Sequence, residues 1–285
     1  MKRSIISLIF TFLVSFSVFS QSSVWMIEGN GTKMYLGGSI HILREQDYPL
    51  PAEFESAFEK SDILVLEADI DPQNQKAVAQ EIIGLTLYPN NKSLKTELRE
   101  EVYNKLDSAF TTAGLSLKQM TGFKPVMAIL TLMQIELVKM GVTSEGVDMY
   151  FLKKANDKGM NLLFLEKVEE QIKLITQMGE GTENDYVLQS LEEMSFYREE
   201  FEKSIESWRN GEVSQWLAQI EEYKNEYPEL YFSLLVERNN RWMQKLEKYM
   251  QTPEVEFVVV GAMHLPGTDG VLKQLKDMGF KIKQL

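Results

Sequence analysis

The chain has 285 residues, of which 44% are hydrophobic, and its formal net charge is −12. Its length and apolar content are enough to bury a large core, which excludes an intrinsically disordered chain. The acidic balance argues against a nucleic-acid partner, because phosphate recognition needs a basic face.

Residues 1–20 have the pattern of a secretory signal peptide. Two basic residues are followed by an apolar run, Ile5–Val14, and then by a short serine-rich segment. The apolar run is shorter than the ~20 residues needed to span a bilayer, which favours cleavage near Ser20 or Gln21 over a membrane anchor. We therefore expect an exported protein, periplasmic or extracellular, with no stable membrane anchor after cleavage. The chain has no cysteine, so its fold must rest on packing without disulfides.

The first elements predicted after the signal peptide are a hairpin, a helix and a strand. Residues 24–27 and 33–36 are apolar and flank Asn30-Gly31, a strong turn signal in a loop of two or more residues. A helix starts near Pro49, and an apolar strand, residues 63–69, follows it directly. Strand, helix and strand without polar alternation predict a buried, largely parallel sheet.

The next part of the chain is predicted to be mostly helical. Apolar residues recur with helical periodicity in residues 73–87, 93–113, 125–140 and 146–158. Ser93 is the type of residue that caps a helix N-terminus, and Pro125 is typical of a first helical turn. A second apolar strand, residues 161–166, follows these helices.

Residues 167–251 contain no predicted strand, only acidic amphipathic helices, and such an insertion in a sheet often forms a cap over the site. The chain then closes with a strand, a helix and a strand at residues 255–260, 270–278 and 280–285. We therefore expect an α/β fold with a central, largely parallel or mixed sheet, an N-terminal hairpin and a large helical insertion or cap. Residues 21–285 are expected to form a single domain.

The chain has only two histidines, and both follow an apolar strand in the same way. His41 ends Gly38-Ser39-Ile40-His41, and His264 ends Gly261-Ala262-Met263-His264. Ligands of α/β sheets bind beyond the carboxyl ends of the strands, so both histidines are placed where a site is expected. A single Gly-x-x-His is more often a turn beside a surface histidine, but its occurrence at both histidines favours a shared site.

Three charged residues are further candidates for this site. Glu67 ends an apolar strand, where a carboxylate is costly to bury unless it is paired or binds a metal; the alternative is an exposed acid. Glu166 ends a second strand in the same way. Arg238 lies in a polar segment of the last helix before residue 251, and its sequence context favours the surface over a pocket.

A series of short motifs extends along nearly the whole chain after residue 20. They are Gly38-Ser39-Ile40-His41, Glu67, Lys124-Pro125, Gly146-Val147-Asp148, Leu165-Glu166 with Gln171, Arg238-Asn239, and Gly261-Ala262-Met263-His264-Leu265-Pro266-Gly267 with Gly270-Val271. In content and order these motifs resemble the TraB/PrgY/GumN family, which includes the Tiki metalloproteases.

The resemblance implies a fold similar to that of the erythromycin esterase and ChaN haem-binding proteins. For Tiki-like members it implies metal-dependent peptide cleavage through the two Gly-x-x-His motifs, supported by manganese or cobalt. Carried over to this chain, it implies His41 and His264 as metal ligands and Glu67 as a third ligand or a supporting group. It makes Glu166 a candidate base and raises Arg238 to a candidate catalytic residue.

The chemistry of these residues agrees with a metal-dependent hydrolase. The chain lacks His-Glu-x-x-His, a cysteine nucleophile and Gly-x-Ser-x-Gly, which argues against a zinc-protease helix and against an acyl-enzyme. Imidazoles and carboxylates together can hold Mn, Co, Zn or Fe, and the ion would activate water and polarise a carbonyl.

We therefore expect a secreted or periplasmic hydrolase with a peptide or protein substrate. One alternative is a non-catalytic protein that binds haem, metal or a peptide signal, and another is a structural partner in an export assembly. Sequence alone leaves the oligomeric state open.

Overall fold

The computed structural model describes residues 21–71, 83–89, 91–143 and 145–285. The predicted signal peptide, residues 1–20, and most of the predicted helix 73–87 lie outside these residues. In the part of the chain that is described, no helix is both long enough and apolar enough to cross a membrane.

A six-stranded sheet forms the centre of the fold, with the strand order β4-β3-β5-β2-β1-β6. Its strands are β1 (Val24–Gly29), β2 (Thr32–Ser39), β3 (Ile63–Leu66), β4 (Asn161–Phe164), β5 (Glu256–Gly261) and β6 (Lys281–Gln284). Strands β4, β3, β5 and β2 are parallel, whereas β1 is antiparallel to both β2 and β6. The predicted α/β fold with a mixed, largely parallel sheet and an N-terminal hairpin is confirmed, and the hairpin turn is the two-residue loop Asn30-Gly31.

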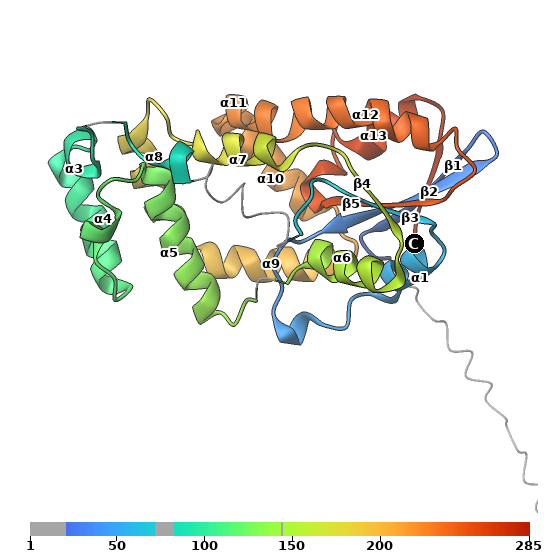
Figure 1. Cartoon of the computed structure of the whole chain (residues 1–285), viewed down its shortest axis with the longest axis horizontal. Helices are drawn as coiled ribbons and strands as arrows, with labels where there is room; N and C mark the ends of the chain where they lie inside the picture. Colours follow the sequence, from blue (N-terminus) through green and yellow to red (C-terminus); the bar gives the residue numbers. More distant parts are fainter. Residues whose placement is uncertain (1–20, 72–82, 90, 144) are drawn as a thin grey trace, which may run out of the picture.

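Helices cover both faces of this sheet (Figure 1). Alternate residues of β5 point to opposite faces: Phe257 and Val259 belong to one core cluster, and Val258 and Val260 to the other. The first face is covered by α1 (Ala52–Glu59), α6 (Val147–Lys158) and α9 (Tyr197–Arg209), and the second by α12 (Glu237–Tyr249) and α13 (Val271–Asp277).

A third core cluster lies among helices away from the sheet, at one end of the molecule (Figure 1). It comprises α3 (Leu94–Glu97), α4 (Glu100–Thr112), η2 (Leu117–Met120), α5 (Pro125–Lys139) and α8 (Glu183–Glu193). Ser93 caps α3 and Pro125 begins α5, as predicted. The single helix expected at residues 93–113 is divided, because buried Leu98 is extended and the N–H of Arg99 donates to the Asn184 side chain.

Residues 167–251, all of which are described, contain helices and no strand, as the sequence predicts. The further helices of this region are α7 (Val168–Thr176), α10 (Ser214–Glu226), α11 (Pro228–Tyr231) and the π-helical turn η3 (Phe232–Val236). The turn η3 joins α11 directly to α12, so the three form one continuous helix.

The register of the parallel strands brings their carboxyl ends to one edge of the sheet. Leu66 pairs with both Phe164 and Val259, and Ser39 pairs with Gly261. The segments that leave these strands carry the predicted site residues, so the topology alone collects them at the edge where α/β proteins bind ligands.

At the opposite edge, Glu256 begins β5 as a buried acid that is incompletely paired. Its Oε1 accepts a hydrogen bond from Thr252, whereas its Oε2 has no partner within the described residues. Burial raises the pKa of Glu256 to about 7, and the nearby acids Glu254 and Asp62 add to the shift. The folded state therefore binds this proton more tightly than the unfolded state, and stability falls as pH rises from about 4.5 to 7.

We predict that Glu256→Gln raises the melting temperature at pH 8 and has little effect at pH 4, because glutamine removes the buried charge. About 1 kcal/mol corresponds to roughly 2–4 °C for a chain of this size, and we expect at least that shift. Thermal unfolding followed by circular dichroism at both pH values measures it. The matched control is Glu254→Gln, an exposed neighbour that should give a smaller shift of the same sign, and equal shifts in both variants would contradict the assignment.

Candidate functional site

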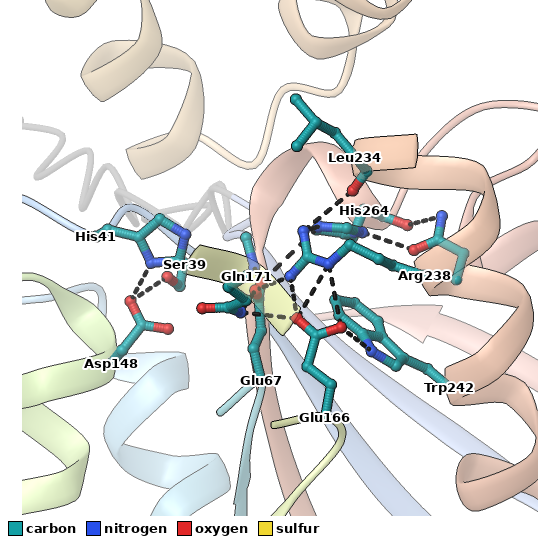
Figure 2. A network of polar contacts seen from close by, with 12 residues as sticks. Ser39, His41, Glu67, Asp148, Glu166, Gln171, Leu234, Arg238, Trp242 and His264 are labelled. Atoms are coloured by element: carbon teal, nitrogen blue, oxygen red, sulfur yellow. Dashed lines mark hydrogen bonds and ion pairs between the residues drawn. The ribbon is translucent and has the colours of Figure 1, made fainter. Parts of the chain in front are cut away.

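The guanidinium of Arg238 lies at the centre of the site (Figure 2). Its Nε donates to both oxygens of Glu166, at 3.0 and 3.2 Å, and its Nη2 donates to Glu166 Oε1 at 2.6 Å and to Glu67 Oε2. Its Nη1 donates to the carbonyl of Leu234 at 3.0 Å and to Nε2 of His264 at 2.9 Å. All five N–H groups of the side chain are therefore used.

The surface position that the sequence pattern favours for Arg238 is wrong, because this residue is only 7% exposed. The continuous helix formed by α11, η3 and α12 contains a π-helical turn that ends at Val236, two residues before Arg238. Such turns interrupt the regular backbone ladder and are frequent at functional sites. Here the carbonyl of Leu234, within the π-helical turn, accepts a hydrogen bond from the arginine side chain.

His264 is buried and fixed in one tautomer. It belongs to the short helix η4 (Ala262–His264), which follows β5, and its ring centroid lies 4.4 Å from that of Trp242. Because a guanidinium only donates hydrogen bonds, Nε2 of His264 must accept from Arg238, and Nδ1–H then donates to Oδ1 of Asn239 at 2.6 Å. Burial lowers the pKa of His264 to about 3, so the imidazole is neutral at pH 7.

Glu67 is buried, so its alternative interpretation as an exposed acid is wrong. Its Oε1 accepts the N–H of Gly261 at 2.6 Å, and its Oε2 accepts from Arg238 and, at 2.9 Å, from Nε2 of Gln171. Burial opposes ionisation, but the neighbouring cationic groups and the Gly261 N–H together lower the pKa of Glu67 to about 2. The carboxylate is therefore charged at pH 7.

Glu166 is the second buried carboxylate and accepts hydrogen bonds on both oxygens. Besides Arg238, it accepts from Gln171 at 2.8 Å and from the indole N–H of Trp242 at 3.2 Å. Gln171 thus bridges Glu166 and Glu67 through one amide nitrogen. The candidate base Glu166 is therefore hydrogen-bonded on both oxygens, as Glu67 is, and its role as a base stays a prediction.

His41 differs from His264, because 62% of its side chain is exposed. Its Nδ1 lies 2.8 Å from Oδ2 of Asp148, a buried carboxylate that also accepts from the Ser39 hydroxyl at 2.5 Å. The charge of Asp148 raises the pKa of His41 to about 9. In the described part of the chain, Nε2 of His41 has no hydrogen-bond partner, so this nitrogen remains open to a ligand.

Close packing at Gly146 brings Asp148 to His41. A Cβ atom at Gly146 would lie 2.1 Å from the carbonyl carbon of His41, so only glycine allows this approach. The N–H of Val147 donates to the carbonyl of Ile40 at 3.0 Å and seats the N-terminus of α6 on the segment that follows β2. Asp148 then lies in the first turn of α6, where the helix dipole favours a negative charge.

Both histidines and Glu67 converge on Gly261. A Cβ atom placed on Gly261 would lie 3.3 Å from Oε1 of Glu67 and 3.5 Å from both Nε2 of His41 and Cδ2 of His264. The structure therefore brings together the five sequence-predicted site residues: His41, Glu67, Glu166, Arg238 and His264. The edge of His264 faces this point with a carbon, whereas His41 and Glu67 face it with polar atoms.

This arrangement does not fit a metal ion held jointly by His41, His264 and Glu67. Within the described residues, no group of three or more histidine, cysteine, aspartate or glutamate side chains is placed to hold a metal. The Nε2 of His264 and Oε2 of Glu67 instead accept hydrogen bonds from Arg238. The metal implied by the resemblance stays a prediction.

Several residues of the site have no role assigned from sequence. Asp148, Gln171 and Asn239 belong to the motifs of the resemblance but carry no local signal of what they contact. Asp148 lies 107 positions from His41 in the chain, and the packing of the N-terminus of α6 on the segment that follows β2 brings them together. The sequence gives no sign that Trp242 belongs to the site, because a tryptophan in a helix is ordinarily part of the apolar core.

The model of the TraB/PrgY/gumN family matches residues 23–284 of this sequence. The chain belongs to this family. Two curated relatives are proteins titled "Uncharacterized protein YbaP", from Escherichia coli strain K12 and from Shigella flexneri. Each is 25% identical to this chain over 249 residues, which cover 85% of this family member and 86% of the relative. No solved structure matches.

We predict that Asp148→Asn lowers the pKa of His41, because it removes the charge that holds the imidazole proton. The measurement is an NMR titration of the imidazole signals, which is simple because the chain has two histidines. In the parent protein we expect a titration near pH 9 for His41 and none above pH 5 for His264, and His264→Ala assigns the signals.

The matched control is Asp157→Asn, which removes an exposed acid from the far end of the same helix. It should leave the titration of His41 in place. An unchanged His41 pKa in Asp148→Asn would refute the proposed dyad.

Proposed function

We propose that this family member is an exported hydrolase that cleaves peptide bonds at the carboxyl edge of its sheet, beside Gly261. The observation that carries the proposal is the pair of polar atoms that face this point: Nε2 of His41, which has no hydrogen-bond partner among the described residues, and Oε1 of Glu67, which accepts the N–H of Gly261. Asp148 orients the exposed imidazole through its other nitrogen, an arrangement typical of catalytic histidines. Family membership and the match of the motifs support the same class of activity.

His41 and Glu67 have opposite proton affinities, which suits a division of acid and base roles. The raised pKa of His41 keeps it protonated at pH 7, so its Nε2 can give a proton to the departing amine. The ionised Glu67 can orient a water molecule and take its proton while the water oxygen bonds to the carbonyl carbon. The C–N bond then breaks, and transfer of the proton from Glu67 to His41 restores the site.

The remaining polar residues hold this pair in place. Arg238 and Gln171 fix Oε2 of Glu67, which leaves Oε1 directed at Gly261. His264 and Asn239 in turn hold Arg238 from the side of η4. In this proposal Arg238, His264 and Glu166 act by positioning Glu67, and not by contact with the substrate.

The test is a peptide library incubated with the protein lacking residues 1–20, with cleavage products identified by mass spectrometry. We expect His41→Ala and Glu67→Gln to reduce the cleavage rate by about 10²–10⁴-fold, because each removes a proton-transfer group. Glu169→Gln, an exposed acid on α7, is the control and should keep full activity. Parallel reactions with chelator and with added Mn, Co or Zn test the metal dependence implied by the resemblance.

One of two results would reject the proposed site, and the other would reject the proposed hydrolase activity. One is cleavage that persists in His41→Ala, which would place the activity elsewhere. The other is the absence of cleavage under every metal condition, which would favour the binding alternative, a protein that sequesters haem, metal or a peptide signal. An absorption spectrum of the purified protein separates these ligands, since bound haem gives a Soret band.

A further inference from the structure

Two buried carboxylates lie side by side at the ends of adjacent strands. Their negative charges need a positive charge nearby to be stable in the interior. The N–H of Glu166 donates to the carbonyl of Glu67 at 2.8 Å, so the two residues are held side by side just beyond β4 and β3. Both are less than 10% exposed. Two ionised carboxylates so close together and removed from water require a cation between them.

Arg238 supplies this positive charge, and all its N–H groups donate hydrogen bonds to atoms of the protein. Its donors reach both carboxylates, the lone pair of His264 Nε2 and one backbone carbonyl, so no N–H remains for a substrate. The guanidinium also lies over the ring of Trp242, with 4.8 Å from Cζ to the ring centroid. The cation is therefore held on every side and belongs to the framework of the site.

The atoms that surround this guanidinium are of the types that bind transition metals, but in the described residues they are not placed to hold one while Arg238 lies between them. Two carboxylate oxygens and an imidazole nitrogen are a donor set that suits Mn, Co or Zn with additional waters. Each donor can use a given lone pair for the arginine or for an ion, but not for both. A guanidinium in this place supplies one positive charge against the two carboxylates, where a divalent ion would supply two, and it uses the lone pairs that an ion would need.

We infer that Arg238 is the built-in cation of this site and takes the place that a divalent metal would occupy between Glu67, Glu166 and His264. The parent protein then needs no ion at this position. Removing the guanidinium leaves its surrounding oxygens and nitrogen unpaired around a vacated space, and we expect these donors to close on a divalent ion there. This inference does not rest on the proposed hydrolysis, because it concerns occupancy alone.

The experiment compares the metal content of the parent protein, Arg238→Ala and Arg241→Ala. Arg241 is the matched control, because it lies on the same helix and within 3.6 Å of Glu166 but is 41% exposed at its side chain. Each protein is treated with chelator, exchanged into cobalt(II) or manganese(II), and separated from free ion by gel filtration. Metal per chain is measured by mass spectrometry, and cobalt coordination is followed by visible absorption.

We expect about one ion per chain in Arg238→Ala, with the visible bands of coordinated cobalt, and far less than one in the parent and in Arg241→Ala. Adding Glu67→Gln to Arg238→Ala should remove the bound ion. Metal in the parent at one per chain that is lost in His264→Ala would overturn the inference. A folded Arg238→Ala that gains no ion would overturn it as well.

If Arg238→Ala does not fold, the parent and His264→Ala decide the question. A parent that retains no ion supports Arg238 as the cation, and one that holds an ion through His264 refutes it. Failure of peptide cleavage would not change either result, so the occupancy of the site and the proposed hydrolysis are tested separately.

Discussion

The site depends on the pairing of one buried guanidinium with two buried carboxylates. Glu67 and Glu166 follow adjacent parallel strands, so the sheet itself forces two like charges together, and the charge on Arg238 makes their burial tolerable. The pairing also connects the layers of the fold, because the acids follow the sheet and the arginine comes from the helix that covers it. Replacing either Arg238 or one of the two glutamates with a neutral residue leaves uncompensated charge in the interior. Such a change typically lowers the free energy of unfolding by about 3–5 kcal/mol.

This pairing explains why two similar motifs have different roles. Each Gly-x-x-His follows a parallel strand, but His264 lies beneath the helix that carries Arg238 and serves as an acceptor for its guanidinium. His41 lies at the exposed side of the same edge, where Asp148 controls its proton and its second nitrogen stays open. His264 therefore has a structural role in the site, whereas His41 is free to contact a ligand.

Much of this architecture can be predicted from the sequence, because it follows from local patterns. Apolar runs without alternation predict the parallel strands, and the Gly-x-x-His motifs and strand-end glutamates predict which edge carries the site. The position of Arg238 cannot be predicted in this way, since a polar stretch in a helix ordinarily faces water. Its burial depends on a π-helical turn and on partners more than 70 residues away, such as Glu166, which no local pattern encodes.

The most direct test of Arg238 as the central cation is a crystal structure of the protein grown with excess manganese, with anomalous diffraction recorded to locate the ion. Our account predicts an ordered guanidinium between Glu67, Glu166 and His264 and no anomalous peak among these three residues. A manganese peak bound by Glu67 and His264, with Arg238 displaced from between them, would contradict it.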